Sequence, residues 1–193
     1  MLGLKLPTDP RWVNIAGKNL KEILTDHAYC EQKAASNAIS IIIRFPEYTD
    51  VVKEMIAICK EEMEHFEMVH ELIISYGYSL GRERKDDYVN DLLLFIKKGG
   101  DREQQFIEAM LFAATIEARS CERFKLLSEE LKDECLRNFY RKLMASEASH
   151  YTTFLGFARK YAKTIDVEKR WQEFLDHESG LMKKYGNKET IHG

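Results

Sequence analysis

The sequence predicts an all-α protein: a four-helix bundle with a crossover helix between its second and third helices and an extra helix near the C-terminal end. Three observations support this prediction. Only 3 Pro and 10 Gly occur in 193 residues, with little Val/Thr alternation, which argues against an all-β fold. Apolar residues recur at helical spacing over four long stretches. A spaced pattern of Glu and His residues also occurs twice, and helices account for its spacing.

The composition predicts one soluble helical domain over residues 1–193. Hydrophobic content of 45% and charged content of 32% allow a real core under a charged surface. The four cysteines form no C-x-x-C pair and no disulfide spacing, which predicts a reducing, cytoplasmic location. No apolar run approaches the roughly 20 residues of a membrane span. The net charge of −3 would be offset by two divalent ions, so it does not exclude a nucleic-acid partner.

Local signals mark the boundaries of the predicted helices. Pro46 ends the first long helix, and Gly77 is placed to cap the second. Gly99 and Gly100 end a short amphipathic helix, the crossover, and Asp101 begins a capping box that opens the third long helix. In chain order the predicted elements are an irregular arm (1–17), two long helices (18–45 and 49–76), a basic loop (77–86), the crossover helix (86–98), two more long helices (from 101, and 133–162), a terminal helix (167–185) and a loose tail (186–193).

The motif E-x-x-H carries the main chemical signal, because positions three apart share one face of a helix and can hold the same metal ion. Four of the six histidines follow a Glu at this spacing: Glu62/His65, Glu67/His70, Glu147/His150 and Glu189/His192. Only two of these motifs have another Glu about thirty residues earlier. Glu31 precedes the first motif, and Glu117 precedes the third.

The spacing of these residues predicts a dimetal site in a bundle of the ferritin-like class. Pro46 lies midway between Glu31 and Glu62, and a polar stretch around Lys132 lies midway between the other pair. If both points are turns, each carboxylate stands about fifteen residues, or roughly 23 Å, from its turn, and the arms of each hairpin present their ligands at one depth. The predicted ligands are Glu31, Glu62, His65, Glu117, Glu147 and His150.

The ligand types favour iron or manganese, since four carboxylates and two imidazoles form a hard, oxygen-rich set. Glu67 is rotated off the apolar stripe of its helix, so Glu67/His70 is interpreted as a solvated pair. His27 faces the same way as Glu31 and is interpreted as a satisfied core histidine, and the cysteines near the ligands as small buried hydrophobes. Small residues flank Glu31 and Glu117 in the sequence: Ala34, Ala35, Ala38, Ala113, Ala114 and Ala118. They leave room for an organic substrate or, nearly as well, allow close helix packing.

Three segments resemble the MiaE family, the tRNA 2-methylthio-N6-isopentenyladenosine hydroxylases: DHAYCEQKAASNA (26–38), EEMEHFEMV (61–69) and IEARSCERF (116–124). The resemblance runs over most of the chain. It implies a ferritin-like, non-haem di-iron monooxygenase that hydroxylates the isopentenyl group beside the anticodon, with O2 as co-substrate. It also implies two iron ions (Fe2+/Fe3+) bound by the six predicted ligands, and a tRNA anticodon stem-loop as partner. No flavin, NAD or haem motif occurs, so an external ferredoxin- or reductase-type donor is expected to supply electrons.

Two other functions use the same features. The first is a ferritin- or bacterioferritin-like ferroxidase, although the basic loop, crossover helix and terminal helix fit a self-assembling shell poorly. The second is a helical binding module whose metal only stabilises the fold. For the RNA partner, basic residues in the loop and after the fourth helix are candidate contacts, and an ordinary solvated surface is the competing interpretation. These residues are Arg82, Arg84, Lys85, Lys97, Lys98, Arg102, Arg159, Lys160 and Lys163.

Overall fold

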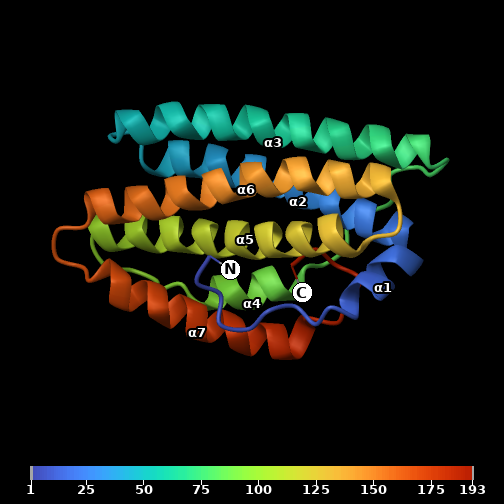
Figure 1. Ribbon diagram of the computed structural model, residues 1–193. Helices are drawn as coiled ribbons and strands as arrows, with labels where there is room; N and C mark the ends of the chain where they lie inside the picture. Colours follow the sequence, from blue (N-terminus) through green and yellow to red (C-terminus); the bar gives the residue numbers. More distant parts are fainter. Residues whose placement is uncertain (1, 193) are drawn as a thin grey trace. The chain divides into compact units, whose positions relative to one another are not determined.

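The computed structural model describes residues 2–192, and within this range it contains helices and no strand, as the all-α prediction requires (Figure 1). None of the described helices is both long enough and apolar enough to cross a membrane. In chain order the helices are α1 (Trp12–Lys18), α2 (Leu20–Arg44), α3 (Thr49–Ser75), α4 (Asp87–Phe95), α5 (Arg102–Glu130), α6 (Glu134–Tyr161) and α7 (Val167–Tyr185).

The described chain divides into two compact units. The hairpin unit comprises residues 18–85 and 189–191, and the main unit comprises residues 2–17, 86–188 and 192. Each unit holds one of the two predicted long hairpins, so each is described by itself.

In the hairpin unit, α2 and α3 lie side by side and antiparallel (Figure 1). The amide of Phe45 still bonds to the Ile41 carbonyl, and the helix then ends before Pro46, as predicted. The loop after α3 returns along α2, where the Tyr29 hydroxyl donates to the Gly81 carbonyl at 3.0 Å. A Cβ at Gly81 would lie 3.1 Å from the Thr25 methyl group, which explains glycine at this close approach.

The main unit is built around α5, which is buried on nearly every side and pairs along its length with α6 (Figure 1). Helices α4 and α7 pack against each other and against α5. Helices α4 to α7 each begin with an aspartate whose side chain accepts a backbone N–H of the first turn, which satisfies an otherwise unbonded donor. These N-caps are Asp86, Asp101, Asp133 and Asp166.

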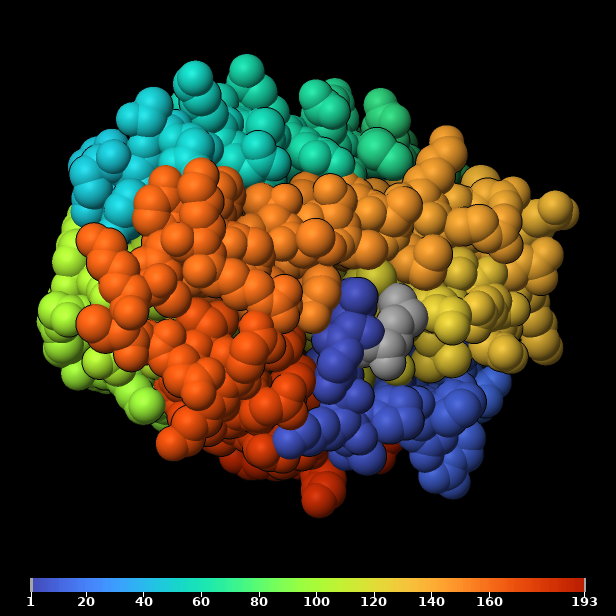
Figure 2. Space-filling model, turned by 60° about the vertical axis from the view of Figure 1, so that its left-hand side comes forward, coloured from blue at the N-terminus to red at the C-terminus, as the bar shows by residue number. Residues whose placement is uncertain are grey.

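Two buried arginines tie α5 to the rest of the main unit. Arg119 donates to the Glu178 carboxylate of α7, and both side chains are 0% exposed. Arg123 lies 3.9 Å from the centroid of the Trp12 ring and donates to the Gly186 carbonyl at 2.9 Å. Figure 2 shows the N-terminal arm, in blue, lying against the surface of α6 and α7, in orange.

The two chain ends are more ordered than predicted. Residues 1–17 were expected to be irregular, but Trp12–Lys18 form α1, whose Trp12 donates its ring N–H to the Lys188 carbonyl at 2.9 Å. The loose tail predicted for residues 186–193 is also wrong over its described residues, since Ile191 and His192 are buried. The partners that order these segments lie more than 60 residues away in the sequence, so no local pattern indicates them.

The turn between α6 and α7 is fixed by a carboxylate, and we expect this contact to weaken in acid. Glu103 accepts the backbone N–H groups of Lys163, Thr164 and Ile165 at 2.7, 2.8 and 3.1 Å. These bonds, led by that of Thr164, lower the pKa of Glu103 to about 2. A lowered folded-state pKa gives a stabilisation that is present above the ordinary carboxyl pKa and lost as the pH falls toward 2. Thermal unfolding across that range should therefore depend less on pH in Glu103→Gln; an unchanged dependence would contradict the contact.

Candidate metal centre

The hairpin unit brings three predicted ligands together. Glu31 lies on the buried stripe of α2, and Glu62 and His65 lie one turn apart on the buried stripe of α3. The Nδ1 atom of His65 is 3.6 Å from Glu31 Oε2 and 3.4 Å from Glu62 Oε2. The ligand atoms of these three residues, here called the hairpin triad, lie within 4.8 Å of one another.

Electrostatics in the hairpin triad show what a metal ion would replace. Burial alone would lower the pKa of His65, but its contacts with Glu31 and Glu62 raise that pKa to about 10. Burial would likewise raise the pKa of Glu31, but hydrogen bonds from His27 and His65 hold it well below its usual value. A protonated imidazole thus balances two buried carboxylates, and a cation that binds there would take over this role from the proton.

The main unit brings together the other three predicted ligands, here called the main triad. Glu117 lies on α5, and Glu147 and His150 lie one turn apart on the buried face of α6. All three side chains are at least nine-tenths buried, and their ligand atoms lie within 4.8 Å of one another. The main triad has the same composition and helix arrangement as the hairpin triad: one Glu on the first helix and an E-x-x-H pair on the second.

Two neighbours of the triads behave as buried core residues, as predicted. His27 is fully buried, and its Nε2 lies 2.6 Å from Glu31 Oε1. The partner of His27 is thus itself a predicted ligand, and the i,i+4 spacing of the two residues is the sequence signal for this contact. Cys121 donates its thiol to the Met144 carbonyl at 3.3 Å, and burial raises the pKa of this thiol to about 12. Its thiol is therefore neutral near pH 7, and its sulfur is not part of the group of ligand atoms in either triad.

The two remaining E-x-x-H motifs do not bring their Glu and His into a common group of ligand atoms within the described residues. Glu67 is exposed and His70 is half-buried beside the Phe66 ring, in agreement with the interpretation as a solvated pair.

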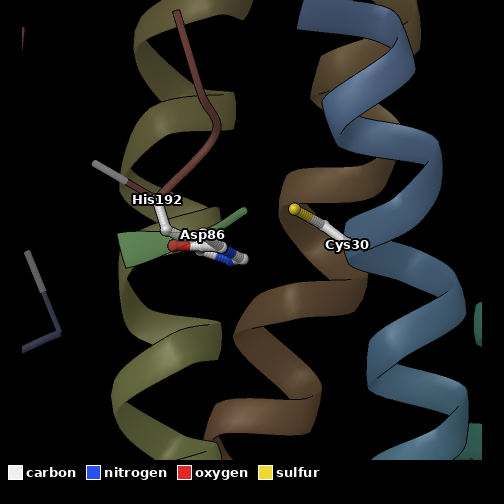
Figure 3. A group of neighbouring side chains, drawn as sticks. All are labelled: Cys30, Asp86 and His192. Atoms are coloured by element: carbon white, nitrogen blue, oxygen red, sulfur yellow. The ribbon is translucent and has the colours of Figure 1, made fainter. Parts of the chain in front are cut away.

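The motif ending at His192 serves to anchor the chain. Figure 3 shows the Asp86 and His192 side chains next to each other. His192 Nδ1 lies 3.2 Å from Asp86 Oδ2, and its Nε2 lies 3.1 Å from the Ser120 hydroxyl of α5. These contacts fix the segment after α7 within the main unit, a role that the sequence motif did not indicate.

The donor chemistry of both triads fits iron. Each supplies two carboxylates and one imidazole from a buried helix face, which is the oxygen-rich, nitrogen-containing set that iron and manganese favour. The rigid helices fix the ligands at the spacing predicted from the sequence.

Known proteins are similar to this chain over most of its length. A family model described as tRNA-(MS2IO6A)-hydroxylase (MiaE) matches residues 2–193. A protein of Pseudomonas putida named tRNA 2-(methylsulfanyl)-N(6)-isopentenyladenosine(37) hydroxylase is 34% identical, over 85% of this chain and 78% of its own length. A protein of the same name from Salmonella typhimurium is 26% identical, over 93% of this chain and 83% of its own length.

A solved structure shares the fold. It is described as Protein 43 with aldehyde deformylating oxygenase activity from Synechococcus, and it matches with a TM-score of 0.91 and 32% identity over 98% of this chain and 95% of that one. The fold class is therefore the all-α, ferritin-like class predicted from the sequence.

Proposed function

We propose that this chain, which belongs to the MiaE family of tRNA hydroxylases, is an O2-dependent di-iron monooxygenase that hydroxylates the isopentenyl group of 2-methylthio-N6-isopentenyladenosine in tRNA. The observation that carries the proposal is the repeated triad of Glu and E-x-x-H, found in a chain matched by the family model over residues 2–193. The two named relatives support the substrate assignment.

In this proposal, both triads together hold two iron ions. The hairpin triad supplies Glu31, Glu62 and His65, and the main triad supplies Glu117, Glu147 and His150. Bound iron would supply the reduction of O2 and the transfer of one oxygen atom into a C–H bond. The overall reaction consumes the substrate, O2, two electrons and two protons, and yields the alcohol and water. A ferredoxin- or reductase-type protein donates the electrons, and the reaction takes place in the cytoplasm.

The chain's own residues position the ligands and exclude water. His27 lies against one carboxylate oxygen of Glu31, so the contact fixes the rotamer of this ligand and directs its other oxygen toward His65. The burial of all six ligands keeps bulk water away from the reacting atoms, which strengthens electrostatic interactions there.

The function is tested with tRNA that carries the unhydroxylated nucleoside. The iron-loaded protein, a ferredoxin–reductase pair and O2 should convert this nucleoside to its hydroxylated form in intact tRNA, measured by mass spectrometry of the digested RNA. Omission of O2 or of the electron donor should abolish the product. Iron oxidation and storage without nucleoside conversion would contradict the proposal and favour a ferroxidase.

A second candidate is aldehyde deformylation, because the solved structure named for that activity is 32% identical over nearly the whole chain. The same reaction mixture with an aliphatic aldehyde in place of tRNA separates the two functions. Conversion of the aldehyde, with tRNA left unchanged, would assign this second function instead.

A further inference from the structure

We infer that the solvent-exposed face of α6 is the surface on which the phosphate backbone of the tRNA binds. The inference rests on the proposed function and adds to it the part of the protein that holds the RNA. The proposed surface lies on a single helix of the main unit.

The exposed face of α6 carries basic residues and almost no acidic ones. Only Glu134 and Glu147 are acidic in the whole helix; Glu134 opens the first turn, and Glu147 is buried in the main triad. Everything else that is charged on α6 and just after it is cationic: Arg137, Arg141, Lys142, Arg159, Lys160 and Lys163. A surface whose charges are positive raises the local concentration of a polyanion. Such surfaces are typical of proteins that bind nucleic acids.

Between its basic ends, this face carries small side chains. Ala145, Ser149, Thr152 and Gly156 are exposed at helical spacing. Figure 2 shows α6, in orange, extending across the front of the molecule. Small side chains let a sugar–phosphate backbone approach the helix closely, and the hydroxyl group of Ser149 can donate to a phosphate oxygen, whereas that of Thr152 donates to the Ala148 carbonyl at 2.9 Å.

Three basic side chains on this face of α6 are exposed and lie where phosphate can reach them: Arg141, Lys142 and Arg159. Arg141 and Lys142 are both exposed, and the Arg141 guanidinium donates to Asn138 on its own helix. Arg159 pairs with Glu168, but both side chains are more than half exposed, and an exposed ion pair of this kind contributes little to stability. Phosphate can therefore replace Glu168 at low energetic cost.

The other E-x-x-H helix has the opposite character. On the exposed side of α3, Glu64, Glu67 and Glu71 follow the last basic residue of that helix, Lys60. These carboxylates would repel phosphates. Of the two helices that carry E-x-x-H pairs of the triads, α6 is therefore the better surface for RNA.

The basic loop after α3 is a weaker candidate than the sequence suggested. Arg84 donates to the backbone carbonyls of Glu22 and Glu189, and Lys33 pairs with Glu83 at 2.9 Å. Arg84 therefore stabilises the hairpin unit, and its replacement would confuse loss of structure with loss of RNA binding.

The test reverses two charges on α6 and, as a matched control, two on α3. Each phosphate that a basic residue neutralises steepens the dependence of log K on log salt by about 0.7 to 0.9. Arg141→Glu with Lys142→Glu should weaken binding of the tRNA anticodon stem-loop about tenfold or more at 100 mM salt and reduce the slope by about 1 to 2. The control, Lys53→Glu with Lys60→Glu, makes the same change in net charge on α3, which is the acidic helix. It should therefore change the affinity less than about twofold. Iron content and circular dichroism show that each variant remains folded.

The outcomes separate this inference from the proposed function. If the original chain hydroxylates tRNA while the α6 variant binds it with unchanged affinity and salt dependence, the inference is wrong and the function stands. If the α6 variant binds RNA normally but accepts electrons slowly from its donor, the face binds the donor protein and the inference is again wrong. If the original chain neither binds nor modifies tRNA, the proposed function itself fails.

Discussion

Glu147→Ala should lower the iron content by at least one ion per chain and abolish tRNA hydroxylation, with the helical content retained. The residue is 3% exposed, and it belongs to the main triad with Glu117 and His150. Alanine removes both of its ligand oxygens and leaves the rest of α6 unchanged. Metal analysis after reconstitution and mass spectrometry of digested tRNA measure the two effects, and circular dichroism follows the fold.

The chain supplies its own matched control for this variant. Glu67 occupies the same place in an E-x-x-H motif on α3, but its side chain is exposed. Glu67→Ala should therefore keep full iron content and activity. Equal iron loss in both variants, or a single tightly bound zinc ion unaffected by either, would contradict the di-iron assignment.

Arg119→Met should cost about 3–5 kcal/mol of unfolding free energy, because it leaves the buried carboxylate of Glu178 without its charge partner. Burial already raises the pKa of Glu178 even with the guanidinium present. A raised folded-state pKa means that the acidic group destabilises the fold at high pH and that protonation relieves this cost. The destabilisation of the variant should therefore be smaller at about pH 5 than at about pH 8. Urea unfolding at both values measures it.

A double variant separates charge from packing. Arg119→Met combined with Glu178→Leu removes both charges and keeps apolar volume, so it should recover most of the lost stability. Breaking the exposed Arg159–Glu168 pair by Arg159→Met should cost less than about 1 kcal/mol. A double variant as unstable as Arg119→Met alone would show that the arginine's packing and its bonds to the N-terminal arm dominate.

The helices and the ligand sets could be predicted because their signals are local. Apolar spacing and Pro46 place α2 and α3, and the E-x-x-H spacing puts Glu147 and His150 on one face of α6. The repeated offset to Glu31 and Glu117 separated the two E-x-x-H pairs that join a buried triad from the solvated Glu67/His70. The spacing within each motif follows from the helical period, and the offset to the earlier Glu follows from the position of the turn between the two helices.

The features that the sequence did not predict depend on contacts between distant residues. Helix α1 forms where Trp12 can insert beneath Arg123 and bond to the backbone near residue 188. His192 is held by Asp86 and Ser120, which lie 106 and 72 residues away in the sequence. Contacts between such distant residues depend on how the helices pack, and no local spacing pattern in the sequence predicts them.

The division of the chain between the two units also has a kinetic consequence. Residues 18–85 of the hairpin unit lie between two segments of the main unit, 2–17 and 86–188. Local pairing of α2 with α3 closes a short loop, so this hairpin can form while the following residues are still being synthesised. The main unit has a high contact order, because Thr8 bonds to Glu122 and Trp12 to residue 188. We therefore expect the main unit to complete its folding after the hairpin, once the segment after α7 is available to contact Trp12 and Arg123.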